Sequence, residues 1–79
     1  MEYNGWKNKA TWNVALYINN DYNLYQLACS YQRISGKEAT YKGFFQYAGL
    51  KGATPDGVMW DCPTLCKTDL NELIQTMND

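Results

Sequence analysis

Apolar residues recur with the period of an α-helix in three separate stretches of the chain. In each stretch they occupy positions i, i+3, i+4 and i+7, which places them together on one face of a helix. The stretches cover residues 24–31, 41–48 and 70–77. Apolar faces of this kind usually pack on a shared core. The pattern therefore predicts helices at about 21–34, 36–48 and 68–77.

Short polar side chains precede these stretches where a helix needs an N-cap. Asn20 and Asp21 stand before the first stretch, and Thr68 stands before the third. Before the second stretch, Ser35 and Glu38 have the spacing of a capping box. We expect these residues to set where the three helices begin.

Residues 11–19 are compatible with either a helix or a strand. Their apolar residues alternate as in a half-buried strand and include residues of high β-propensity: Trp12, Val14, Leu16 and Ile18. A strand would need a partner, and only the short stretch 58–60 is available. On a helix the apolar residues cover a broad arc and leave Asn13 and Tyr17 together on the opposite side. We expect a helix at about 9–19, with the strand as the alternative.

The segment 50–67 has no helical periodicity and follows Gly49, a residue typical of a helix end. A loop of this length in a compact domain is either functional or held by the core. The sequence Thr-Pro-Asp-Gly at 54–57 predicts a tight turn, and Trp60 is the expected anchor of the loop. The prediction is an all-α single domain over residues 1–79, with four short helices and one long ordered loop.

The composition is that of a globular domain, since the 79 residues are 46% apolar and 19% charged. The net charge of −1 is typical neither of a polybasic nucleic-acid binder nor of a strongly acidic DNA mimic. The longest apolar run, residues 14–18, is far shorter than a membrane span, so we expect no membrane insertion and a cytoplasmic location. Aromatic residues reach 15% and suit either a small core or a binding surface.

Residue types that commonly carry catalysis or bind metals are sparse. The chain has no histidine and only three cysteines, Cys29, Cys62 and Cys66, which is too few for a four-ligand zinc site. We expect free thiols, no metal and no cofactor. Without histidine, the Ser–His and Cys–His pairs of many hydrolases are excluded. Turn chemistry accounts for Asp56 and Asp61, so we expect no enzymatic activity.

Two segments carry a family resemblance. Residues 6–21 read WKNKATWNVALYINND, and residues 54–60 read TPDGVMW. Both are similar to segments of small uncharacterised proteins encoded by bacteriophages, cyanophages among them, and by plasmids. The similarity spans most of the chain. It implies an accessory protein of a phage or mobile element that acts in the cytoplasm of its bacterial host.

Such small accessory proteins often bind and block a host protein, including host defence complexes such as CRISPR effectors. The resemblance, the small size and the excess of aromatic residues lead us to expect a non-enzymatic inhibitor that covers a surface of a host bacterial protein. The candidate partner-binding residues are four tyrosines outside the apolar stripes and three loop residues, namely Tyr17, Tyr22, Tyr25, Tyr47, Asp56, Met59 and Asp61.

Two alternatives belong to other functional classes. One is a small nucleic-acid-binding module in which exposed tyrosines stack on bases and six basic residues converge on one face. Those basic residues are Lys7, Lys9, Arg33, Lys37, Lys42 and Lys51. The other is a self-associating structural protein, which only the aromatic surplus favours.

Overall fold

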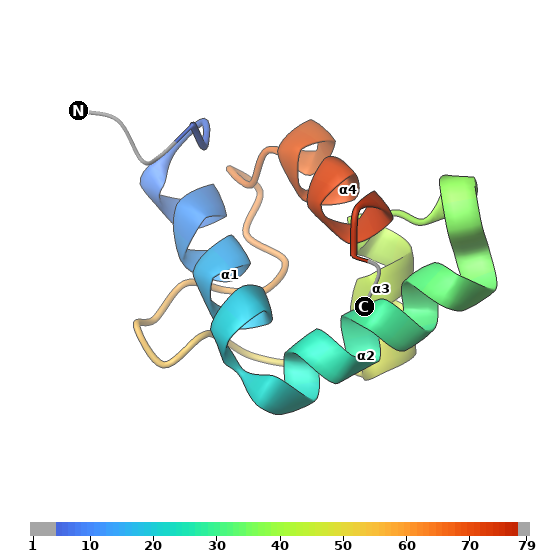
Figure 1. The fold of residues 1–79 in the computed structure, drawn as a ribbon. Helices are drawn as coiled ribbons and strands as arrows, with labels where there is room; N and C mark the ends of the chain where they lie inside the picture. The colour runs from blue at the N-terminus through green and yellow to red at the C-terminus, as the bar shows by residue number, and fades with distance from the viewer. Residues whose placement is uncertain (1–4, 78–79) are drawn as a thin grey trace.

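The computed structural model describes residues 5–77, and within this range the chain forms four α-helices and one 3-10 turn (Figure 1). In chain order these are α1 (Lys9–Asn20), α2 (Tyr22–Ser35), η1 (Gly36–Glu38), α3 (Tyr41–Ala48) and α4 (Lys67–Gln75). Residues 11–19 are helical, and no strand forms among the described residues, where extended pairing is limited to isolated bridges such as that between Ala53 and Met59. The predicted all-α class is confirmed.

The core lies where the four helices meet. Helix α1 contacts α2, α2 contacts α3, and α4 packs against all three (Figure 1). The largest fully buried apolar side chains come from three of these helices and are Val14, Ile18, Phe44, Leu70 and Ile74. Helix α2 contributes the small residues Ala28 and Cys29, both buried. The apolar stripes of the sequence therefore form the core, as predicted.

Two of the predicted helix ends are confirmed. Asp21 caps α2, because its Oδ1 accepts a hydrogen bond from the Leu24 N–H at 3.1 Å. Helix α3 stops at Gly49, which takes a φ of +66° that favours glycine. The following Leu50 N–H donates to the Phe45 carbonyl at 3.1 Å and closes the last turn.

The predicted start of the third helix at residue 36 is wrong. Ser35 is the last residue of α2, and its side chain makes no cap hydrogen bond, so the capping box with Glu38 does not form. Gly36 ends α2 with a φ of +56°, and only a single 3-10 turn follows. Helix α3 starts at residue 41 because Thr40 is extended and its Oγ1 accepts from the Gly43 N–H at 3.0 Å.

Helix α4 begins at Lys67, one residue before the predicted start. Thr68 therefore lies inside the helix and is not its N-cap, which corrects the prediction. Cys66 occupies the capping position, and its side chain makes no cap hydrogen bond. Its backbone N–H donates to Thr11 Oγ1 at 2.9 Å. This bond ties the start of α4 to α1.

Helix α1 is packed on two sides, by the other helices and by the loop that follows α3 (Figure 1). Asn13, predicted to face away from the core, is only 1% exposed, so that prediction is wrong. Its Oδ1 accepts from Thr54 Oγ1 at 2.7 Å, and its Nδ2 donates to Asp56 Oδ2 at 2.8 Å. The two segments that carry the family resemblance, 6–21 and 54–60, are thus bonded to each other.

The long loop is ordered and anchored as predicted. A turn at 54–57 is closed by the Gly57 N–H, which donates to the Thr54 carbonyl at 2.8 Å. Trp60 is only 7% exposed and belongs to the core. Its backbone N–H donates to the Gly52 carbonyl at 3.0 Å. The loop therefore acts as a fifth packing element that brings residues 60–66 beside α3.

Candidate functional site

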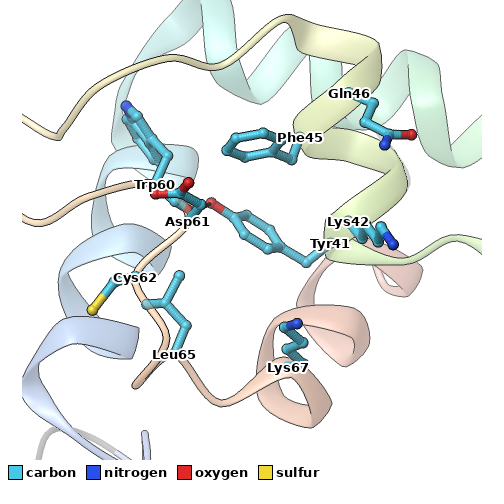
Figure 2. Close-up of a pocket in the computed structure, with 9 residues that line it drawn as sticks. All are labelled: Tyr41, Lys42, Phe45, Gln46, Trp60, Asp61, Cys62, Leu65 and Lys67. Carbon is cyan, nitrogen blue, oxygen red and sulfur yellow. Dashed lines mark hydrogen bonds between the residues drawn. The ribbon is translucent and has the colours of Figure 1, made fainter.

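A pocket of about 250 Å³ opens between α3 and the chain that leads from Trp60 into α4 (Figure 2). Side chains from three segments line it: Tyr41, Lys42, Phe45 and Gln46 from α3, Trp60, Asp61, Cys62 and Leu65 from the loop, and Lys67 from α4. Most of its lining surface is aromatic or aliphatic, and its three charged residues, here called the rim, are exposed. The pocket is smaller than the roughly 300–1,000 Å³ typical of cofactor and small-molecule sites.

Tyr41 holds the two sides of the pocket together. Its backbone N–H donates to Asn71 Oδ1 at 2.8 Å, which fixes the start of α3 against α4. Its phenol donates to the Trp60 carbonyl at 2.7 Å across the pocket floor. Burial, with a smaller contribution from the nearby Asp61 carboxylate, raises the pKa of the Tyr41 phenol. The phenol therefore stays protonated and keeps donating this hydrogen bond.

Phe45 and Trp60 form two of the aromatic walls. Phe45 stands one helical turn after Tyr41 on the same face of α3, with its ring centroid 6.4 Å from that of Tyr41. Phe45 is partly exposed, whereas its neighbour Phe44 is fully buried in the core. Figure 2 shows the Phe45 ring beside Trp60, with Leu65 approaching from the opposite side. The pocket thus presents aromatic surface to solvent.

The rim carries two ammonium groups and one carboxylate. Lys42 projects from the first turn of α3, Lys67 from the first residue of α4, and Asp61 from the loop beside Trp60 (Figure 2). All three side chains are exposed, and none makes a hydrogen bond or ion pair within residues 5–77. These charged groups are therefore not engaged by another described side chain and are open to a ligand.

Cys62 also lines the pocket, but its thiol is used elsewhere. The Cys62 sulfur lies 3.0 Å from the Thr64 hydroxyl, and Figure 2 shows it directed away from the aromatic walls. Cys66 is partly buried and Cys29 is buried. All three cysteines are free thiols, as expected. The pocket contains no nucleophile paired with a base.

The structure separates most of the predicted partner-binding residues. Tyr17 and Asp56 come together, and the pKa of the Tyr17 phenol is raised by partial burial and by the nearby Asp56 carboxylate. Their contact belongs to the junction between α1 and the loop. Tyr25 is partly buried against the core. Asp61 alone of this set reaches the pocket.

Three predicted partner-binding residues expose apolar surface outside the pocket. Tyr22 is 74% exposed at the start of α2, and Met59 is 48% exposed in the loop. Tyr47 is 45% exposed on α3, where its ring lies 5.5 Å from the ring of Tyr31. These residues supply exposed apolar surface on three different segments of the chain.

The basic residues considered for nucleic-acid binding lie on several elements. Lys7 and Lys9 are at the start of α1, whereas Arg33 and Lys37 are at the end of α2 and in η1. Figure 1 places the start of α1 and the end of α2 at opposite ends of the molecule. Of the remaining two, Lys51 follows α3 and Lys42 lies at the pocket.

Sequence reasoning missed the pocket residues Tyr41, Phe45, Leu65 and Lys67 as a site. The two aromatic residues belong to a helical stripe and were therefore assigned to the core. No local signal distinguishes them, because Tyr41, Phe44, Phe45 and Ala48 occupy the four positions of an ordinary core-facing stripe. Only the approach of the 60–67 segment to α3 makes Phe45 the wall of a pocket.

The described residues also limit the chemistry available. Between residues 5 and 77, no three His, Cys, Asp or Glu side chains are placed to hold a metal ion together. In the same range, no helix has both the length and the apolar character that crossing a membrane requires.

The whole chain, residues 1–79, matches the model of a family of unknown function, DUF7249, and the protein therefore belongs to that family. A search of curated proteins and a search of solved structures each gave no significant match.

Proposed function

We propose that the protein is a small non-catalytic binding protein that recognises another protein through the pocket between α3 and the 60–67 segment. One observation carries the proposal: the domain presents an open aromatic pocket whose rim charges make no hydrogen bond or ion pair with the described residues. Binding energy in protein interfaces concentrates where one large side chain fills such a pocket and is surrounded by polar contacts. The pocket is of the right size for one side chain of a partner.

The proposed biological role is that of a phage or mobile-element accessory protein that blocks a host protein, such as a component of a defence complex, in the bacterial cytoplasm. The resemblance of the segments 6–21 and 54–60 to phage and plasmid proteins supports this role. So does the small size, because a stoichiometric inhibitor needs only one surface. Tyr22 and Tyr47 add exposed aromatic surface that could extend the contact.

A pull-down with a matched pair of variants tests the proposal. The tagged protein is expressed in a bacterium, purified at moderate salt with nuclease, and compared with Phe45→Ala and Ile34→Ala. Both substitutions remove a large apolar side chain, but Ile34 is 73% exposed on α2 and does not line the pocket. Thermal melts confirm that both variants fold.

The proposal predicts that one host protein is captured in a stoichiometric amount by the wild type and by Ile34→Ala, and is lost with Phe45→Ala. Equal capture by all three proteins would remove the pocket from the binding site. A wild-type protein that recovers only nucleic acid when nuclease is omitted would contradict the proposal and favour the nucleic-acid-binding alternative.

A further inference from the structure

We infer that the pocket accepts an acidic peptide segment of the partner, with one aromatic or large aliphatic side chain as its anchor and carboxylates beside that anchor. The inference rests on the proposed function and specifies the chemistry of the partner. It follows from the volume of the pocket, the nature of its walls and the placement of the charges at its rim.

The volume and the walls of the pocket favour one large apolar side chain as the anchor. A space of about 250 Å³ holds one large side chain and leaves little room for more. Tyr41, Phe45 and Trp60 present ring faces and edges, and Leu65 adds an aliphatic surface. An inserted aromatic ring can make edge-to-face contacts with such walls, which add to the gain from burying its apolar area. The Tyr41 phenol proton is not available to an inserted polar side chain, because the phenol already donates to the Trp60 carbonyl.

The charges at the rim favour acidic residues beside the anchor. Lys42 and Lys67 line the pocket from two different helices, and neither side chain has a hydrogen-bond or ion-pair partner within the described part of the chain. Their combined charge exceeds that of Asp61, so the rim is positive although the whole chain carries −1. Carboxylates on the partner, beside the anchor and over α3 and α4, would pair with both ammonium groups. Asp61 on the other side disfavours a segment that is acidic at both edges of the opening and so gives it a direction.

The same rim argues against a nucleic-acid strand. Phosphates flank every base of a strand, so one phosphate would lie close to the Asp61 carboxylate. Sequence-specific recognition of a base also uses hydrogen bonds along its edge, and the pocket walls are mainly apolar. A short oligonucleotide is therefore the competing probe in the test.

Titrations followed by backbone and tryptophan-indole NMR signals of the isotope-labelled full chain test the inference. Four probes are compared: a pentapeptide with a central phenylalanine, two aspartates before it and two glycines after it, the same peptide with lysines in place of the aspartates, the aspartate peptide with alanine in place of phenylalanine, and a five-nucleotide thymidine strand. We expect the first peptide to shift the Trp60 indole signal and the signals of residues 41–46. The lysine and alanine peptides are expected to bind at least fivefold more weakly.

Charge reversal provides the matched control. Lys42→Glu with Lys67→Glu should weaken binding of the aspartate–phenylalanine peptide roughly two- to thirty-fold, as expected for the loss of two solvent-exposed ion pairs. Lys9→Glu with Lys37→Glu changes the net charge by the same amount at positions outside the pocket and should change binding less than twofold. Added salt should weaken binding to the wild type.

Three results would overturn the inference: equal or tighter binding of the lysine peptide, tighter binding of the thymidine strand at the pocket, or no shift of pocket signals at millimolar peptide. The pull-down distinguishes failure of this inference from failure of the proposed function. If host-protein capture needs Phe45 but tolerates the reversal of Lys42 and Lys67, the pocket binds a partner that is not acidic. If capture does not need Phe45, the pocket is not the binding site and both proposals fail.

Discussion

Replacing Asn13 by alanine tests how the loop that builds the pocket is held. The Asn13 side chain is almost fully buried and joins α1 to the loop through Thr54 and Asp56. The substitution leaves the buried Thr54 hydroxyl without its acceptor, which costs about 1–3 kcal/mol. It also removes a hydrogen bond to a carboxylate that can regain water, which adds about 1 kcal/mol.

The expected loss of about 2–4 kcal/mol is a large share of the roughly 4–12 kcal/mol available to a chain of this length. For a domain of this size it lowers the melting temperature by roughly 8–30 °C. Circular dichroism melts and urea titrations measure the change. Asn19→Ala is the matched control, because Asn19 is exposed in the same helix, and its replacement should change stability by less than about 0.5 kcal/mol.

A double-mutant cycle with Thr54→Val separates the bond between the two side chains from other effects of the substitution. The two changes should together cost less than the sum of their separate costs, because each removes the same hydrogen bond. Melting temperatures of Asn13→Ala and Asn19→Ala within about 3 °C of each other would refute the reasoning. So would fully additive costs for Asn13 and Thr54.

Three further predictions concern the surroundings of the pocket. Trp60→Ala should destabilise the domain by about 3–5 kcal/mol in urea titration, because the ring is buried in the core, and an unchanged midpoint would contradict this. Gly43→Ala should lower the melting temperature although alanine favours helices, because the new Cβ would lie 2.8 Å from the Tyr31 Cζ. Combining it with Tyr31→Leu should recover part of the loss. A single variant more stable than the wild type would contradict the close approach. Burial raises the pKa of Tyr41 above the value of about 10 in an unfolded chain, so stability should fall as the pH rises above 10, when only the unfolded state loses this proton. Tyr41→Phe should be less stable at pH 7 but lose less stability between pH 9 and 11, and parallel pH profiles would contradict this.

The helices could be predicted because local rules and burial agree in them. The stripes at 41–48 and 70–77 are apolar on one side, and the core covers that side. Asp21 and Gly49 act through their immediate neighbours, so their roles as caps are visible without tertiary structure. Trp60 was recognisable as an anchor because a long loop in a small domain needs one.

The errors arose where a tertiary contact outweighs a local pattern. Asn13 was placed on an outer face because a polar side chain on an amphipathic helix usually faces solvent. The loop instead supplies a hydroxyl donor and a carboxylate acceptor that satisfy its amide, so it can be buried. At Thr68 the reason differs, because the Cys66 N–H is satisfied by Thr11 and the helix starts without a side-chain cap.

The pocket was beyond sequence reasoning because its walls are far apart in the chain. Residues 41–46 and 60–67 meet only after the loop has crossed α1. The charges at its rim were visible as residue types, yet Asp61 and Lys42 were assigned to different hypotheses and Lys67 to neither. Their common position depends on the direction in which α3 and α4 begin, which no local pattern determines.

Photo-crosslinking in living bacteria tests the central claim most directly. The photoreactive residue benzoylphenylalanine replaces Gln46, an exposed residue that lines the pocket, or Ile34 as the remote control. We predict that the probe at Gln46 captures one host protein, joined through a segment with an apolar residue next to carboxylates, and that the probe at Ile34 does not. Capture of the same protein from Ile34 and not from Gln46 would contradict the claim that the pocket is the binding site.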